Sequence, residues 1–310
     1  MSRHVLVTGG AGFIGSHLAD AFIERGDRVS ILDNLSTGNL RNLNPKAELH
    51  EADLREERTI ELIRSLKPDL VSHHAAQIDV RHSVADPAVD AEINIVATIR
   101  LLQASLDAGV KRFVFASTGG AIYGEPVTTP QDEQHPSHPL SPYGCAKLAV
   151  EHYMHYFREI HGLSTVALRY ANVYGPRQNS KGEAGVIAIF ADRLLHGGEV
   201  TINGDGDQTR DYVFVGDVVR ANMAVCDDLS LAGPFNVGTG VESTVNELYR
   251  QLAAAAGVDR DAQHGPAKTG EQRRSVLDGT KLRAVAKLPE PVALADGIRQ
   301  TFAWFRAARG

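Results

Sequence analysis

The chain has 310 residues, which suits one large α/β unit or two unequal domains and excludes a peptide hormone or a disulfide-stabilised miniprotein. Apolar residues make up 43% of it and charged residues 23%, as in globular proteins with a sizeable core. Its formal net charge of −6 provides no overall basic surface, so we expect neither nucleic acid nor a membrane as a partner.

The termini, cysteines and histidines restrict the class further. The N-terminus enters the apolar run Val5-Leu6-Val7 directly, without the segments of a signal peptide, and no apolar run reaches the roughly 18 residues of a membrane span. Cys145 and Cys226 lack CxxC spacing, and His73-His74 has no acidic or cysteine partner at ligand spacing. We therefore expect a cytoplasmic protein without a bound metal.

Short runs of Val, Ile, Leu and Phe alternate with longer helical patterns, which is typical of βαβ units in a parallel sheet covered on both faces. Strands are predicted near 5–8, 29–33, 48–51, 70–74, 112–117, 165–170 and 235–237. Helices are predicted near 13–26, 56–67, 88–108, 142–161, 185–196, 215–228 and 243–256. This order predicts an α/β fold with a Rossmann-type, doubly wound parallel sheet.

The alternation of strands and helices becomes less regular after Tyr170, where glycine-containing breaks surround the predicted helix at 185–196. We interpret residues 1–171 as the first domain, with 210–238 returning to it. Residues 172–209 and 239–310 then form a smaller, C-terminal substrate-binding domain.

A glycine-rich turn follows the first strand and opens the first helix. In Thr8-Gly9-Gly10-Ala11-Gly12-Phe13-Ile14-Gly15, the glycines have the spacing of a dinucleotide-binding loop. Glycine permits the tight turn and a close approach to a pyrophosphate, and the helix N-terminus supplies N–H donors. The position of the motif between a strand and a helix favours this interpretation over an ordinary βα turn.

Two acids follow the second and third strands. Asp33 lies where a carboxylate can accept hydrogen bonds from the adenosine ribose, which favours NAD over NADP because a 2′-phosphate would be repelled. The alternative for Asp33 is an Asx turn over Asn34-Leu-Ser-Thr-Gly38. Asp53, followed by Leu54, can meet the adenine edge or cap a helix.

Tyr143 and Lys147 lie four residues apart at the start of the helix predicted over 142–161, so their side chains share one face. A phenol is a poor base at neutral pH, but a neighbouring ammonium favours the phenolate and brings its pKa toward the working pH. This spacing alone also occurs by chance on helix surfaces. Together with the glycine loop and Asp33 it predicts a general base.

A third catalytic residue, with a hydroxyl side chain, is expected at the carboxyl end of the strand at 112–117, where ligands bind in open α/β sheets. Both Ser117 and Thr118 lie there, and either can hydrogen-bond a substrate oxygen and relay its proton to Tyr143. The alternative for each residue is a hydroxyl that caps its own turn.

These motifs, with His74-Ala75-Ala76 and Arg169-Tyr-Ala-Asn172-Val-Tyr-Gly-Pro-Arg177, resemble the extended short-chain dehydrogenase/reductases, most closely the UDP-glucose (UDP-galactose) 4-epimerases. The resemblance implies tightly held NAD, with Thr118 and Tyr143 handling the proton and Lys147 orienting the nicotinamide ribose. The run from Phe115 to Tyr123 is one residue longer than usual, which leaves Ser117 as an alternative to Thr118. The implied NAD contacts are Gly9, Gly12, Phe13, Ile14, Gly15, Asp33, Asn34, Asp53, Leu54, Ala75, Ala76, Gln77, Asn94, Tyr143 and Lys147.

The same resemblance implies a UDP-sugar site in the second domain. Arg210 would clamp the diphosphate, a role that suits a planar guanidinium, and Glu271 would bind the uridine ribose. Lys268 stands where the family often has arginine, so it supplies charge without a bidentate contact. The complete set of implied substrate contacts is Thr118, Tyr143, Asn172, Val186, Thr201, Ile202, Asn203, Arg210, Tyr212, Lys268 and Glu271.

The implied reaction is NAD-dependent inversion of a UDP-hexose at C4 through a transient 4-keto sugar. A nucleotide-sugar 4,6-dehydratase or decarboxylase is the alternative, although Gly119-Gly120 offers no acid for a second proton. A non-catalytic NAD-binding regulator is a third hypothesis, which the retained Tyr143 and Lys147 argue against. The small Ser275 predicts that N-acetylated sugars are also accepted, and the family pattern implies a homodimer through the helices at 88–108 and 142–161.

Overall fold

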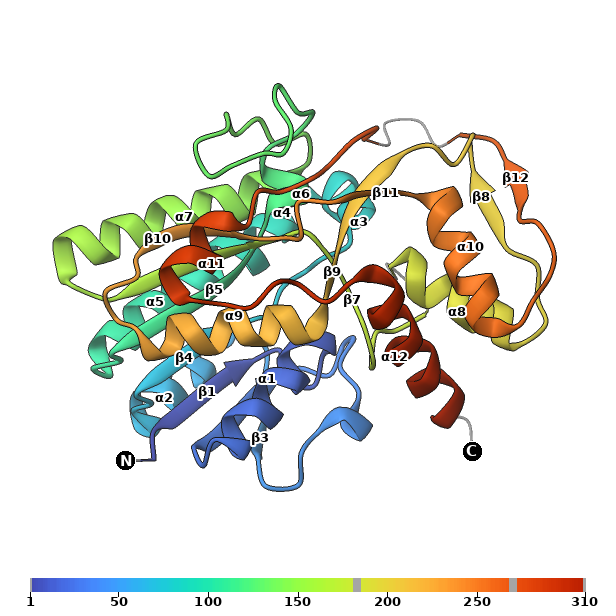
Figure 1. Cartoon of the computed structure of the whole chain (residues 1–310). Coiled ribbons are helices and arrows are strands. Elements are labelled where there is room, and N and C mark those ends of the chain that lie inside the picture. The colour runs from blue at the N-terminus through green and yellow to red at the C-terminus, as the bar shows by residue number, and fades with distance from the viewer. Residues whose placement is uncertain (1, 181–184, 268–271, 309–310) are drawn as a thin grey trace. The chain divides into compact units, whose positions relative to one another are not determined.

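The computed structural model describes residues 2–180, 185–267 and 272–308. The chain divides into two compact units, which Figure 1 shows in sequence colours. Unit 1 comprises Met1–Ile122, Ser137–Arg169 and Val219–Phe235, and unit 2 comprises Tyr123–Pro136, Tyr170–Val218 and Asn236–Gly310. The division at Tyr170 lies next to the predicted one. Two boundaries differ from the predicted ones. Tyr123–Pro136 belongs to unit 2, and the segment that returns to unit 1 is Val219–Phe235 rather than 210–238.

Unit 1 is built on a parallel sheet of seven strands in the order β10-β6-β5-β4-β1-β2-β3. The strands are β1 (His4–Thr8), β2 (Arg28–Asp33), β3 (Glu48–Glu51), β4 (Leu70–His73), β5 (Arg112–Thr118), β6 (Thr165–Tyr170) and β10 (Gly233–Val237). The central strands are buried on both faces because helices cover each side, which explains their continuous apolar runs. The predicted Rossmann-type fold is confirmed, and every predicted strand belongs to this sheet.

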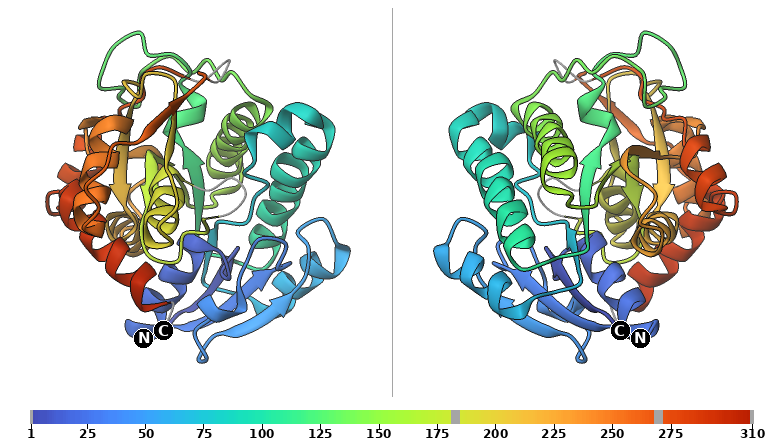
Figure 2. Two further views of the ribbon diagram at one scale, coloured as in Figure 1. Left: turned by 90° about the vertical axis from the view of Figure 1, so that its right-hand side faces the viewer. Right: turned by 90° about the vertical axis from the view of Figure 1, so that its left-hand side faces the viewer.

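Helices α2 (Glu57–Leu66), α5 (Ala97–Asp107) and α7 (Pro142–His161) pack on one face of the sheet. Figure 2 shows α5 and α7 side by side. Their shared core includes Leu6, Leu32, Ile63, Leu101, Phe113, Phe115, Val150 and Phe157. Helix α1 (Phe13–Glu24) packs against β1 and β2, and α9 (Val215–Asp227) follows β9 (Thr209–Phe214).

The prediction of a single helix over 88–108 is wrong in detail. The segment forms α4 (Pro87–Ala91), a π-helical turn (Glu92–Val96) and α5, and it is preceded by the short helix α3 (Val80–Ala85). A π turn adds one residue to the helical repeat and turns the following side chains by a fraction of a turn. Here it contains the buried Asn94, whose contacts are described below. Helix α6 (Gly119–Ile122) and the 3₁₀ turn Leu40–Asn42 were not predicted.

Unit 2 contains two small sheets. Strands β11 (Glu242–Thr244), β9 (Thr209–Phe214) and β7 (Asn172–Tyr174) form one, and β12 (Gln263–Gly265) pairs with β8 (Thr201–Asn203). The buried Asp211 carboxylate accepts hydrogen bonds from the backbone N–H groups of Thr239, Gly240 and Leu277 and so fixes distant segments of the unit. The helices are α8 (Val186–Leu195), α10 (Val245–Ala256), α11 (Thr280–Ala286) and α12 (Leu294–Ala307).

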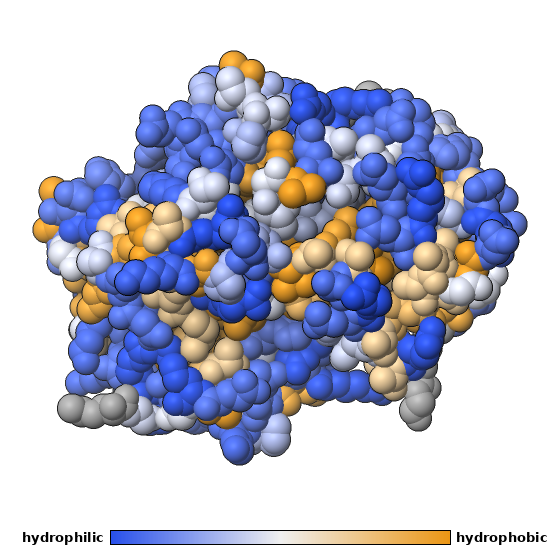
Figure 3. All heavy atoms as spheres, viewed as in Figure 1, coloured by the Kyte–Doolittle hydropathy of each residue, from blue (hydrophilic) through white to orange (hydrophobic). Residues whose placement is uncertain are grey.

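Hydrophilic residues dominate the face of the molecule drawn in Figure 3, with apolar residues scattered among them. Within the described ranges, none of the helices combines the length and the apolar character that crossing a bilayer requires.

A buried arginine joins the returning segment of unit 1 to the sheet. Arg112, at the start of β5, is only 1% exposed, and its guanidinium donates to the backbone oxygens of Val225, Asp228 and Leu231 and to the Ser164 hydroxyl. Burial lowers the pKa of Arg112 to about 10, so it remains charged at neutral pH. The guanidinium therefore gives a donor to each of these carbonyl groups, and the Asp228 oxygen also accepts from the Leu231 N–H.

Replacing Arg112 with alanine is expected to lower the free energy of unfolding by about 3–5 kcal/mol, because it removes the guanidinium donors from these acceptors and leaves a buried cavity. Urea unfolding of the purified variant measures this change. The control is Arg64→Ala, which removes a half-exposed arginine paired with Asp107 and should cost less than about 1 kcal/mol. Equal losses in the two variants would contradict the structural role of Arg112.

Candidate active site

The glycine loop has the geometry of a dinucleotide cradle. Gly9 adopts a φ of +68°, and a Cβ at Gly15 would lie 2.2 Å from the Gly9 carbonyl oxygen. A Cβ at Gly9 would lie 2.7 Å from the backbone nitrogen of Ala75, in the segment that follows β4. Gly12 is the N-cap of α1 and no side chain caps the helix, so the first-turn N–H groups, including those of Phe13 and Ile14, are not blocked by a capping residue. The loop therefore fits a pyrophosphate.

Asp33 ends β2 beside this loop and is buried. Its carboxylate accepts hydrogen bonds from the backbone N–H of Ala11, at 2.9 Å, and of Leu35, at 2.8 Å. The bond to Leu35 is the Asx turn considered as the alternative, and the bond to Ala11 ties the carboxylate to the glycine loop. Asp33 therefore makes the predicted turn and also lies where an adenosine ribose is expected.

Asn34 and Asp53 interact with each other and with Arg55, and Leu54 packs in the core. The Asn34 side chain donates to the Asp53 carboxylate at 2.9 Å, and Arg55 pairs with the same carboxylate at 2.8 Å. Arg55 is the main reason that the pKa of Asp53 lies well below its usual range. Leu54 belongs to the hydrophobic core. Helix α2 has Glu56 as its N-cap, so Asp53 does not cap it as the alternative supposed.

The segment after β4 is held by the π turn. The Asn94 side chain accepts from the Gln77 backbone N–H at 3.0 Å and donates to the Gln77 carbonyl at 2.9 Å. Both side chains also donate to one oxygen of the buried Asp90 carboxylate, which the sequence analysis did not single out. The structure thus brings together Gln77 and Asn94, with Ala75 and Ala76 in the same segment.

Tyr143 and Lys147 lie on the first turns of α7. Ser141 caps this helix by accepting from the Gly144 N–H, and Pro142 occupies the first position, so the helix starts where the sequence predicts. A Cβ at Gly144 would lie 2.5 Å from the Ala121 carbonyl oxygen, so glycine lets this turn approach α6 closely. The Lys147 ammonium donates to the Ala116 carbonyl at 2.9 Å and lies 5.6 Å from the centre of the Tyr143 ring.

The protonation of this pair is set by burial. Burial lowers the pKa of Lys147 to about 8, and the nearby Asp90 and Glu151 carboxylates oppose the shift. Burial and then Asp90 raise the pKa of the Tyr143 phenol above its usual value. The expected lowering of the Tyr143 pKa by Lys147 is therefore outweighed in this structure, and the positive charge of an oxidised nicotinamide is the contribution that would favour the phenolate.

Ser117 and Thr118 end β5 and differ in their surroundings. The Ser117 hydroxyl is buried and donates to Glu151 at 2.5 Å, and Glu151 is in turn paired with Arg169 at 2.6 Å. The Thr118 side chain is half-buried and has no hydrogen bond to another described residue. Neighbouring residues of a strand point to opposite faces, so only one of the two hydroxyls faces away from Glu151.

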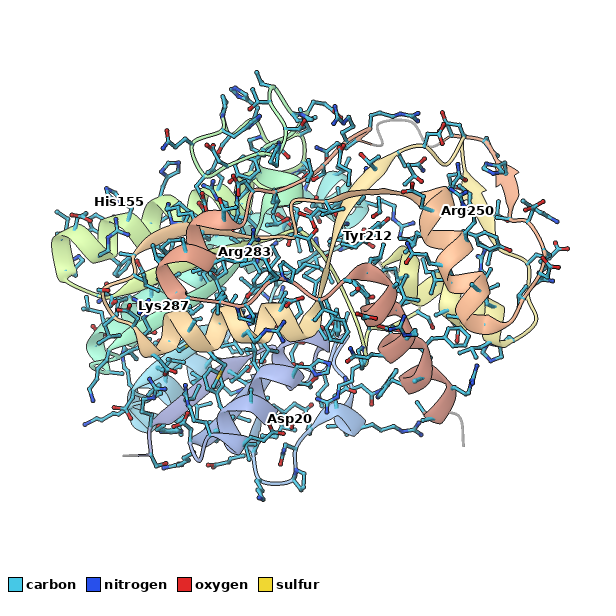
Figure 4. The ribbon with its side chains drawn as sticks, viewed as in Figure 1. Asp20, His155, Tyr212, Arg250, Arg283 and Lys287 are labelled. Atoms are coloured by element: carbon cyan, nitrogen blue, oxygen red, sulfur yellow. The ribbon has the colours of Figure 1, made fainter. Side chains whose placement is uncertain are left out.

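Unit 2 contains a cavity of about 610 Å³, within the range of small-molecule sites. It is lined by the predicted substrate residues Asn172, Val186, Thr201, Ile202, Asn203, Arg210 and Tyr212. Tyr212 comes from β9, as the label in Figure 4 shows. Sequence reasoning missed Gly185, Ile189, Phe190, Arg193, Gln208 and Val245 in this lining. Ile189, Phe190 and Arg193 follow the predicted Val186 by three, four and seven residues along one face of α8, and this spacing is the signal that would have found three of the six missed positions.

Lys268 and Glu271 lie outside the described residues. Ser275 is buried, and its backbone carbonyl accepts from the N–H of Asp211. Among residues 2–180, 185–267 and 272–308, the His, Cys, Asp and Glu side chains form no group of three that could hold a metal ion.

The fold, glycine loop and Tyr143–Lys147 pair define a dinucleotide-dependent enzyme of the extended short-chain dehydrogenase/reductase class. The profile of the NAD dependent epimerase/dehydratase family matches residues 5–238, and the chain belongs to this family. The resemblance inferred from the sequence is thereby confirmed, and NAD is the cofactor.

Three relatives are similar over almost the whole chain. A UDP-glucose 4-epimerase of Mycolicibacterium smegmatis is 44% identical, with 97% of this chain and 98% of the relative covered. The structure of a Thermotoga maritima UDP-glucose 4-epimerase with UDP-glucose is 47% identical, covers 99% and 100% of the two chains, and has a TM-score of 0.95. A Thermus thermophilus UDP-glucose 4-epimerase in complex with NAD is 45% identical, with a TM-score of 0.93 over 98% and 99% of the chains.

Two matches of lower identity bear on the substrate. The structure of a UDP-N-acetylglucosamine 4-epimerase from Methanobrevibacter ruminantium is 34% identical, with a TM-score of 0.93 over 99% of each chain. A dTDP-glucose 4,6-dehydratase of an Actinoplanes species is 35% identical over 98% of each chain.

Gly15→Ala is expected to weaken NAD retention by at least about tenfold, because the added methyl group collides with the Gly9 backbone that shapes the cradle. NAD released from the denatured protein measures this retention. Gly198→Ala is the control, because Gly198 belongs to unit 2 and the milder contact of its Cβ, 3.3 Å from the Arg193 carbonyl oxygen, does not involve the glycine loop. Full NAD content in the Gly15 variant would contradict the assignment of the loop.

Proposed function

We propose that this chain inverts a UDP-hexose at C4, converting UDP-galactose to UDP-glucose with NAD bound throughout. The cavity of unit 2 carries the proposal, because it is lined by the described residues expected to bind the UDP part. The Tyr143–Lys147 pair of unit 1 supplies the proton chemistry. The epimerase relatives at 44–47% identity support the same activity, whereas the dehydratase cited above is more distant.

In the proposed reaction, the Tyr143 phenolate accepts the proton of the sugar 4-hydroxyl, and the hydroxyl at the end of β5 relays it. The glycine loop, Asp33 and Lys147 would hold NAD, which would supply reversible hydride transfer at C4 of the sugar; inversion requires that the hydride comes back to the opposite face of that carbon. The phenol then returns its proton to the new 4-hydroxyl, so the overall reaction is redox-neutral. Arg210 and its neighbours must hold UDP firmly, while the hexose has to turn over.

The competing 4,6-dehydratase activity needs an additional acid to protonate the leaving hydroxyl. Gly119 follows Thr118 and begins α6, so this position provides no carboxylate. We therefore favour epimerisation over dehydration.

We also propose that N-acetylated UDP-hexoses are substrates. Support comes from the small Ser275, predicted to lie beside the C2 substituent, and from the similarity to the UDP-N-acetylglucosamine 4-epimerase. Turnover of UDP-glucose with none of UDP-N-acetylglucosamine would contradict this breadth.

A homodimer through the helices at 88–108 and 142–161 is proposed as well. Val96 is 50% exposed, Tyr156 47% and Ile160 67%, so this helical side of unit 1 presents apolar surface. Light scattering that returns a monomer mass would contradict it. A cytoplasmic location remains our prediction, with Cys145 and Cys226 both free thiols.

The function is tested with UDP-galactose and no added NAD. We expect UDP-glucose to form, and Tyr143→Phe to lower the turnover about 10²–10⁴-fold with the fold intact. Tyr153→Phe, a 42% exposed tyrosine on the same helix, is the matched control and should keep full activity. A Tyr143 variant with most of its activity would overturn the assignment.

The surroundings of Ser117 and Thr118 predict that Thr118 is the relay. Thr118→Val should lower turnover about 10²-fold or more, because the hydroxyl is lost while the shape is kept. Ser117→Ala should keep turnover within a few-fold and instead cost about 1–3 kcal/mol of stability, since Glu151 loses a buried donor. The reverse pattern of turnover would assign the relay to Ser117.

A further inference from the structure

A buried histidine of unit 1 takes no part in the reaction proposed above. His73 is the last residue of β4, and its partner in the register of the sheet is Thr8, the last residue of β1. The His73 Nδ1 lies 2.6 Å from the Thr8 hydroxyl oxygen, and the His73 Nε2 lies 3.0 Å from the hydroxyl oxygen of Thr98 in α5. All three side chains belong to residues that are at most 1% exposed. Bulk water therefore does not compete for these hydrogen bonds.

The direction of the hydrogen bond at Nε2 follows from Thr98. The Thr98 hydroxyl donates its only proton to the Asn94 carbonyl oxygen at 2.8 Å, as threonines in helices commonly do to the carbonyl four residues earlier. A carbonyl cannot donate in return, so this proton is used there. The Thr98 oxygen must then accept from His73, which means that Nε2 carries a hydrogen.

The direction of the hydrogen bond at Nδ1 follows from Thr8. The Thr8 hydroxyl oxygen lies 3.2 Å from the backbone nitrogens of both His74 and Ala75, and an N–H can only donate to it. The His74 N–H is shared with the Thr8 carbonyl oxygen, at 3.1 Å. Within the part of the chain that the structure describes, Nδ1 is the acceptor left for the Thr8 hydroxyl proton. Nδ1 therefore accepts and carries no hydrogen.

The two other states of the imidazole leave hydrogen bonds unmade. A hydrogen on Nδ1, alone or together with one on Nε2, would give the Thr8 oxygen a third donor and leave the Thr8 proton buried without an acceptor, which is costly. A charged ring would also lie near Lys147, whose ammonium is 4.5 Å from the centre of the Phe115 ring that stacks on His73. Burial lowers the pKa of His73 well below its usual value, in agreement with a neutral ring.

We propose that His73 is a positioning residue of the dinucleotide site: as the Nε2–H tautomer, it turns the Thr8 hydroxyl so that its oxygen holds the His74–Ala75 backbone against the glycine loop. The two segments are in close contact at this point, because a Cβ at Gly9 would lie 2.7 Å from the Ala75 nitrogen and 2.8 Å from the His74 carbonyl carbon. A shift of the Thr8 hydroxyl would therefore move one wall of the NAD cradle.

The same hydrogen bonds hold the far end of the segment that follows β4. Asn94, whose backbone oxygen accepts from Thr98, binds the backbone N–H and carbonyl of Gln77 through its side chain. A closed ring of contacts results, which runs through Thr8, His73, Thr98, Asn94 and Gln77 and back along the chain to Ala75. Residues 75–77 are implied NAD contacts, so the ring fixes this wall of the cradle at both ends. The inference concerns cofactor binding and does not depend on which sugar is the substrate.

The first test is the tautomer of His73 in the NAD-loaded protein with ¹⁵N in its histidine rings. Long-range ¹H–¹⁵N correlations distinguish a ring nitrogen that carries a hydrogen from one that does not. We expect a protonated Nε2 and an unprotonated Nδ1 at neutral pH, assigned by the signals that move in Thr98→Val, which removes the acceptor at Nε2. A hydrogen on Nδ1, alone or with one on Nε2, would overturn the inference.

The second test compares His73→Asn with His73→Gln. Both variants lose the ring that packs on Phe113 and Phe115, so their loss of packing is matched. The amide oxygen of asparagine is as many bonds from Cβ as Nδ1 is and can still accept from Thr8, whereas that of glutamine corresponds to Nε2. We expect NAD to leave His73→Asn on dialysis within about threefold of the parent rate, and to leave His73→Gln at least about tenfold faster than the parent.

Equal rates of NAD loss in the two variants would show that His73 acts through packing alone and would overturn the inference. The tautomer measurement decides the question independently if either variant does not fold. A protein that shows the expected tautomer and the expected NAD loss, but does not convert UDP-galactose, would overturn the proposed function and keep the inference.

Discussion

The candidate site depends on keeping the ammonium of an almost fully buried lysine charged. Lys147 is 3% exposed, and its only hydrogen bond to a described residue is to the Ala116 carbonyl. Burial alone would favour loss of its proton, so the charge must be supported by nearby carboxylates. Burial also strengthens the interaction of the ammonium with neighbouring ions, because solvent screens it less. The carboxylates of Asp90 and Glu151 favour the ammonium form of Lys147.

The fold of unit 1 assembles these groups at one edge of its sheet. The carboxyl ends of parallel strands point the same way, so the glycine loop after β1, Asp33 at the end of β2 and Thr118 at the end of β5 converge. Helix α7 brings Tyr143 and Lys147 to the same edge because it follows β5 and packs on the sheet beside α5. The cavity proposed to bind the UDP part is built separately: most of its lining residues come from β7, β8, β9 and α8 of unit 2.

The strands of the large sheet were predictable from the sequence because both faces are buried and the runs of Val, Ile and Leu are continuous. The spacing of Tyr143 and Lys147 predicted that they share one face of α7, and their interpretation as a catalytic pair needed the glycine loop and Asp33 as well. The resemblance supplied the seven predicted residues that line the cavity of unit 2. Three features had no sequence signal. The π turn looks like ordinary helix, a shift of one residue decides whether Ser117 or Thr118 faces Glu151, and Asp90 is a single acid in a helix whose burial depends on tertiary packing. The alternative in which Asp53 caps α2 was wrong, because the helix begins after Glu56 and the Asp53 carboxylate pairs with Arg55.

The central claim is that hydrogen leaves C4 of a UDP-hexose and returns to the same carbon. The most direct measurement is to incubate the protein with UDP-galactose deuterated at C4 and to locate the deuterium in the product by NMR. Our account predicts UDP-glucose that retains deuterium at C4, formed without added NAD. Deuterium at C6 in a 4-keto-6-deoxy sugar, or its loss to solvent, would contradict the account.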